Sequence, residues 1–68
     1  MWNQVQKILN DRSMSIYRLA RKSNIHENTL YSYSRGEAQP SFENACKIAD
    51  ALGVPLDSLR KRNGGSNG

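Results

Sequence analysis

One stretch, residues 15–36, constrains the fold more than any other part of the chain: SIYRLARKSNIHENTLYSYSRG. It begins with Ser15, a residue type favoured at the N-cap of a helix. The apolar Ile16 and Leu19 follow at a spacing of three, which is typical of one face of a helix. We therefore expect a short helix over residues 16–22.

A tight turn follows this helix. Ser23 and Asn24 interrupt the apolar pattern, because both side chains compete for nearby backbone groups and asparagine tolerates a left-handed conformation. Ile25 is apolar within this polar turn. We expect its side chain to fill the gap between two helices.

A second helix is predicted over residues 27–34. Leu30 and Tyr33 would face inward, and Gly36 stands just past the end, where glycine commonly stops a helix. Two helices joined by a turn of three or four residues form a helix-turn-helix, whose second helix can lie in the major groove of DNA.

Three further helices complete an expected all-α fold, at residues 3–12, 42–52 and 56–61. Ser41 is the expected N-cap of the helix at 42–52, and Gly53 is its expected stop. Their inward-facing residues are predicted to be Trp2, Val5, Ile8 and Leu9, then Phe42, Ala45, Cys46, Ile48, Ala49 and Leu52, and finally Leu56 and Leu59.

Chain length and composition limit the class of protein. The 68 residues suit one small domain, predicted over 1–62, followed by a tail at 63–68 that we expect to be disordered or a linker stub. The single cysteine, Cys46, excludes an internal disulfide and a cysteine-based zinc site, and a buried apolar role suits it best. No apolar run approaches the roughly 20 residues that span a bilayer, so we expect a cytoplasmic protein without a membrane partner.

The formal net charge is +4. The whole excess lies in residues 1–35, because the acidic and basic side chains of residues 36–68 balance. A basic half that contains the two-helix segment is the expected footprint of a surface that binds a polyanion. A generally solvated surface is the alternative explanation.

A set of segments carries a resemblance to a known family: Ser15–Ala20, Ile25, Asn28–Leu30, Gly36, Pro40 and Ile48–Val54. In this order they resemble the Cro/repressor (XRE-like) helix-turn-helix family of phage and bacterial transcriptional regulators. The resemblance covers about residues 2–61. It implies a compact five-helix lambda-repressor-like domain that binds double-stranded DNA, with no cofactor and no small-molecule substrate. A repressor acting as a homodimer on a palindromic operator is the expected form, since one small module makes few base contacts.

The chain departs from the family pattern at three positions. Ile16 stands where the family often carries a glutamine that touches a phosphate, so Ser15 or Tyr17 would have to substitute. Ser34 and Leu9 stand where the family often carries a paired glutamate and arginine. Because both members of the pair are absent together, no buried charge is left alone, which favours a repacked version.

Candidate base-reading residues belong to the helix at 27–34 and are Glu27, Asn28, Thr29, Tyr31 and Ser32. Asn28 and Ser32 share a face because they are four residues apart. The Asn28 amide suits bidentate contact with adenine, which is worth about 1–3 kcal/mol of discrimination. Glu27 can accept from cytosine N4, but an acidic residue in the first turn also stabilises a helix without any ligand.

Candidate phosphate-contacting residues are Ser15, Tyr17, Arg18, His26, Arg35 and Gln39. Such contacts position a protein on DNA without reading its sequence. Arg21 and Lys22 rank below them, since both come late in the first helix of the pair and are equally explained as solvated. His26 is the expected N-cap of the second helix and has no partners for a metal site.

The sequence also bears on two other classes of function. An antitoxin-like protein-interaction module, whose main ligand is another protein, is the alternative to DNA binding. An enzyme has little support, because one histidine, one cysteine and no paired carboxylates do not form a catalytic constellation.

Overall fold

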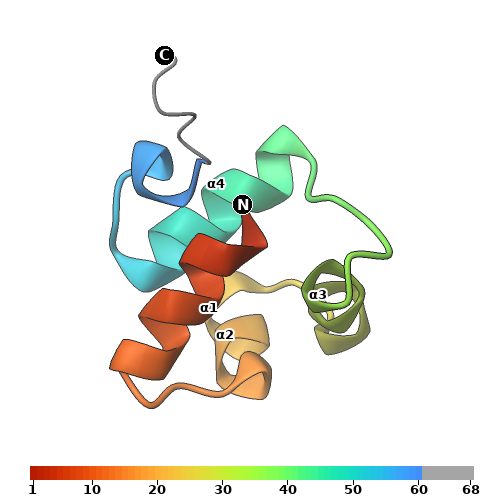
Figure 1. The fold of residues 1–68 in the computed structure, drawn as a ribbon, viewed down its shortest axis with the longest axis horizontal. Helices are drawn as coiled ribbons and strands as arrows, with labels where there is room; N and C mark the ends of the chain where they lie inside the picture. Colours follow the sequence, from red (N-terminus) through yellow and green to blue (C-terminus); the bar gives the residue numbers. More distant parts are fainter. Residues whose placement is uncertain (61–68) are drawn as a thin grey trace.

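The computed structural model describes residues 1–60, which fold into α-helices and one short 3-10 helix without any strand in that range (Figure 1). The elements are α1 (Trp2–Asp11), α2 (Ile16–Ser23), α3 (Glu27–Ser34), α4 (Phe42–Leu52) and η1 (Leu56–Leu59). The all-α prediction is confirmed. The predicted tail at 63–68 lies outside the described residues. Within them, no helix is long and apolar enough to cross a membrane.

The prediction of a fifth α-helix at 56–61 is wrong. The amide of Ser58 donates to the carbonyl of Pro55 at 2.9 Å, and that of Arg60 donates to Asp57 at 3.3 Å. These i to i+3 bonds define a 3-10 turn rather than an α-helix. Arg60 is already extended, with φ −79° and ψ 140°, so the helical segment ends after Leu59. The described domain therefore has four α-helices and η1.

The two serine N-caps are confirmed. The Ser15 hydroxyl accepts from the Arg18 amide at 3.0 Å, and the Ser41 hydroxyl accepts from the Asn44 amide at 3.1 Å. Each bond satisfies one of the amides that the first turn of a helix leaves without a partner.

Each α-helix is followed by a residue in the left-handed conformation. These residues are Ser13, Asn24, Gly36 and Gly53, with φ of 53°, 60°, 76° and 69°. The next amide then donates back to the helix, as from Met14 to the Leu9 carbonyl at 2.8 Å and from Glu37 to Ser32 at 2.9 Å. This pattern satisfies carbonyls that the last turn would otherwise leave unpaired. The predicted stops at Gly36 and Gly53 are confirmed.

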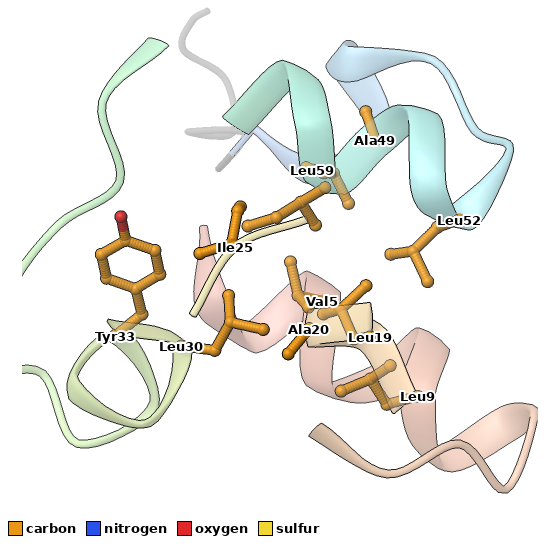
Figure 2. Close-up of a cluster of buried hydrophobic side chains, with 11 residues drawn as sticks. Val5, Leu9, Leu19, Ala20, Ile25, Leu30, Tyr33, Ala49, Leu52 and Leu59 are labelled. Carbon is orange, nitrogen blue, oxygen red and sulfur yellow. The ribbon is translucent and has the colours of Figure 1, made fainter. Parts of the chain in front are cut away.

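The core lies where the helices meet (Figure 2). Its fully buried side chains are Val5, Leu9, Leu19, Leu30, Ile48 and Leu59. Ile25 is only 6% exposed and fills the space beside α2 and α3, as predicted. Leu9 occupies the interior as an apolar residue, which agrees with a repacked version of the family's charged pair.

Two predictions about α4 need correction. The apolar period of α4 predicts that Phe42 faces inward, but its side chain is 76% exposed. Phe42 is the first residue of α4, and the core does not extend beyond that end of the helix. Cys46 is half-buried rather than buried. Ala45, Ile48, Ala49 and Leu52 do form the buried face of this helix.

The packing leaves α3 at one end of the molecule. α2 packs against both α3 and α4, whereas α1 packs against η1 and α3. Along the longest dimension, 34 Å, α3 and η1 lie toward opposite ends (Figure 1). One side of α3 therefore stays free of the rest of the fold.

Candidate nucleic-acid interface

The turn between α2 and α3 sets the direction of the second helix. Asn24 takes the left-handed conformation, and the buried Ile25 anchors the turn to the core. His26 then caps α3, since its Nδ1 accepts from the Asn28 amide at 3.1 Å. The predicted N-cap is confirmed, and Nε2 is the ring nitrogen left to donate to a ligand.

Two side chains anchor α3 to the interior. Leu30 is fully buried and Tyr33 is 7% exposed, and Figure 2 shows Leu30 extending toward Ile25. The Tyr33 hydroxyl accepts from Asn44 Nδ2 at 2.9 Å, which ties α3 to α4. These contacts confirm the inward face that the sequence predicts for this helix.

The candidate base-reading residues differ in solvent exposure and in whether their side chains already form hydrogen bonds. Asn28 is exposed, and its side-chain amide makes no hydrogen bond within residues 1–60. Tyr31 is 37% exposed, while Glu27, Thr29 and Ser32 are partly buried. The Ser32 hydroxyl already donates to the Thr29 carbonyl at 2.8 Å, so it has acceptor capacity left for a base.

The exposed side of α2 is basic. Its sequence contains Arg18, Arg21 and Lys22 and no acidic residue, and none of the three forms an ion pair within the described part of the chain. Arg21 instead donates from Nη1 to the Tyr17 hydroxyl at 3.2 Å, with its Cζ 5.9 Å from the centre of the tyrosine ring. The i, i+4 spacing of Tyr17 and Arg21 places the two side chains next to each other on one face of α2.

Arg35 is less available than the sequence suggested. Its Nε and Nη2 donate to the two carboxylate oxygens of Glu37, at 3.0 and 3.1 Å. This bidentate contact raises the pKa of Arg35 and lowers the pKa of Glu37, through the hydrogen bonds first and the charge attraction second. Both side chains are exposed, as is Gln39 in the same loop. The sequence-based candidates did not include Glu37, which the structure places against Arg35.

The other ion pairs lie away from α2 and α3. Lys47 pairs with Glu43 at 3.9 Å, and Arg60 pairs with Asp57 at 3.6 Å. The charges of Lys47 on α4 and of Arg60 after η1 are thus partly neutralised, whereas the basic side chains of α2 have no ion pair within residues 1–60. Among residues 1–60, no three His, Cys, Asp or Glu side chains are grouped so that they could hold a metal ion.

One helix, a three-residue turn that ends in the N-cap His26, and a second helix with one buried and one free side define a helix-turn-helix domain. The sequence profile described as "Helix-turn-helix" matches residues 5–59, which is most of the chain. The chain belongs to the Cro/repressor (XRE-like) helix-turn-helix family.

Similar curated proteins come from methanogenic archaea and are described as candidate HTH-type transcriptional regulatory proteins. One from Methanococcus maripaludis is 44% identical over 43 residues, which is 63% of this chain and 13% of that protein. Another from Methanococcus vannielii is 43% identical over 44 residues, 65% of this chain and 14% of that protein. The chain thus spans about one seventh of the length of these relatives. No solved structure gives a significant match.

Proposed function

We propose that this domain binds double-stranded DNA in a sequence-specific manner, with α3 in the major groove, and that it regulates transcription as a repressor. The supporting observation is the exposed, unengaged amide of Asn28 on a helix whose Leu30 and Tyr33 are buried. The major groove, about 12 Å wide, admits an α-helix. The names of the archaeal relatives support the regulatory part of the proposal.

In this arrangement the residues of α3 and α2 have separate tasks. Asn28 would read adenine through its amide, with Glu27, Thr29, Tyr31 and Ser32 as neighbouring base contacts. Basic and hydroxyl groups would hold the phosphates on either side of the groove, and so fix the register of α3. Ser15, Tyr17, Arg18, His26, Arg35 and Gln39 are the proposed phosphate contacts, with Arg35 requiring release from Glu37.

The proposed active form is a homodimer on a palindromic operator. An eight-residue helix reaches only a few base pairs, so one copy provides little specificity. Two copies on half-sites about 34 Å apart, one helical turn, would double the number of contacts.

Enrichment of random duplexes on the purified domain tests the proposal. The expected result is one symmetric motif, bound with an affinity that falls steeply between low and physiological salt as counterions are released. If no motif is enriched, or if affinity for the enriched duplex does not depend on salt, the DNA-binding proposal is wrong.

A protein-interaction module is the second candidate, because Phe42 is 76% exposed. It borders an apolar depression of ≈ 240 Å³ that Ala45, Leu56 and Leu59 also line. A partner protein bound there should be lost on Phe42→Ser substitution and should be insensitive to salt, whereas DNA binding should survive this substitution.

A further inference from the structure

Tyr17 and Arg21 together form a feature that the basic character of α2 does not explain. Both line a depression of ≈ 600 Å³ that continues past Asn24 to His26 and Glu27 at the start of α3. Both also line a second depression, of ≈ 390 Å³, on the side of Arg18 and Lys22. The pair is therefore the wall that two surface depressions share.

The contact between the two side chains leaves donors free on each of them. Arg21 Nη1 donates to the tyrosine hydroxyl oxygen at 3.2 Å, so the O–H proton of Tyr17 is available to another acceptor. The guanidinium uses one of its five N–H groups in this bond. Because Tyr17 is 52% exposed, both sets of donors can reach a ligand from solvent.

We propose that Tyr17 and Arg21 act as one phosphate clamp, in which both donate to the same phosphate oxygens of the DNA backbone. Arg21 supplies the charge, and Tyr17 is the positioning residue that holds the guanidinium while donating its own O–H. The inference rests on the proposed function and revises the sequence-based ranking, in which Arg21 stands below Tyr17 as a candidate phosphate contact.

Two physical effects favour a clamp over two independent contacts. A long arginine side chain loses conformational freedom when it binds, and less is lost if a neighbour already restricts it. A hydroxyl that accepts from a cation is also polarised, which strengthens its own donation to an anion. Lys22, on the same helix, has no tyrosine partner and serves as an internal comparison.

The test measures affinity for a mixed-sequence DNA duplex, two helical turns long, at several salt concentrations. Arg21→Gln should weaken binding and reduce the slope of log affinity against log salt by about 0.9, the value for one phosphate contact. Tyr17→Phe keeps the ring and should weaken binding by about 2- to 12-fold, the effect of one hydrogen bond, with little change of slope. The double variant should bind no more weakly than Arg21→Gln alone, because the hydroxyl depends on the arginine.

The control pairs Tyr17→Phe with Lys22→Gln, where the two losses should add. All variants should keep the wild-type melting curve, since both side chains are exposed. Equal binding by Tyr17→Phe and wild type, or additive losses for Tyr17→Phe and Arg21→Gln, would overturn the clamp and leave the proposed function standing. Failure of the wild type to bind any duplex at low salt would overturn both, and is recognised before any variant is made.

Discussion

Glu37 limits how far the Arg35 guanidinium is available to bind a DNA phosphate. Its carboxylate accepts both N–H groups that Arg35 presents, and its negative charge lies in the loop that directly follows α3. A DNA phosphate near this loop would compete with Glu37 for the same guanidinium. In the free protein, Glu37 therefore lowers the attraction between this loop and any polyanion.

Glu37→Gln should strengthen binding to a mixed-sequence duplex several-fold at low salt. The substitution frees Arg35 and removes a charge that repels phosphate. Glu43→Gln is the matched control, because it makes the same charge change on α4, where Glu43 pairs with Lys47. Equal gains for both variants would mean that only net charge matters; no gain for Glu37→Gln would show that Arg35 lies outside the interface.

The same pair predicts a pH effect. Arg35 lowers the pKa of Glu37, so Arg35→Gln should raise the pKa of that carboxyl toward its ordinary value. Because the folded-state pKa is the lower one, the stabilisation by this pair is present above the unfolded-state pKa. It is lost as the pH falls through the folded-state value. A carbon-detected NMR titration of Glu37 measures this directly, and an identical midpoint in the variant would refute the pairing in solution.

At the scale of the elements, the attachment of α3 decides whether its outer side is presented in a fixed orientation. Leu30 supplies apolar contact, and the bond from Asn44 to the Tyr33 hydroxyl links the helix to α4. The Tyr33 hydroxyl and the Asn44 side-chain amide are partly buried, so removal of either one leaves the other without its hydrogen-bond partner.

Tyr33→Phe should lower the free energy of unfolding by about 1 kcal/mol, the net contribution of one such hydrogen bond. Urea unfolding followed by circular dichroism measures this change. Tyr31→Phe is the control, since its hydroxyl makes no hydrogen bond within residues 1–60 and its side chain is exposed. A loss of the same size in both variants would contradict the anchoring role of Tyr33.

The end of α1 offers a gain of stability. Ser13 has a φ of 53°, in the left-handed region. This conformation is unfavourable for a residue with a Cβ atom, whereas glycine adopts it without that steric penalty. Ser13→Gly should therefore raise the free energy of unfolding by about 0.5–1 kcal/mol. Ser13→Ala keeps the Cβ atom and should give no gain. If the Ser13→Gly variant melts at or below the wild-type temperature, Ser13 does not adopt the left-handed conformation in solution.

The elements that the sequence predicted correctly depend on local chemistry. Ser15 and Ser41 start helices, and Gly36 and Gly53 follow helix ends, because each effect acts within a few residues. The incorrect predictions concern features that depend on residues far apart in the sequence or on where the core ends. Phe42 fits the apolar period of α4, but periodicity does not tell where the core ends.

At the candidate site, too, contacts within one helix or its cap were predictable from the sequence, and contacts between helices or in an irregular loop were not. The His26 cap was predictable from its position, and the pairing of Tyr17 with Arg21 follows from their spacing. The bond between Tyr33 and Asn44 joins different helices, so no local pattern reveals it. The Arg35–Glu37 contact depends on the path of an irregular loop.

For the molecule as a whole, the distribution of basic charge and the position of α3 both favour a polyanion-binding surface on α2 and α3. Basic side chains without an ion pair among residues 1–60 lie on α2, which packs against α3, whereas Lys47 of α4 and Arg60, which follows η1, are paired with acids. A field of this kind orients a protein toward a polyanion before contact is made. Leu30 and Tyr33 attach α3 to the core in the free protein, so the proposed recognition requires no folding of this helix.

Asn28→Ala tests whether the outer side of α3 reads bases. Binding of the wild type and the variant is compared on the enriched duplex and on a mixed-sequence duplex at one salt concentration. If Asn28 contacts a base, the variant should lose about 1–3 kcal/mol of binding free energy on the enriched duplex and almost none on the mixed one. Asn3→Ala, an exposed asparagine on α1, should change neither affinity. Equal losses of the Asn28 variant on both duplexes, or no loss on either, would show that Asn28 does not read a base.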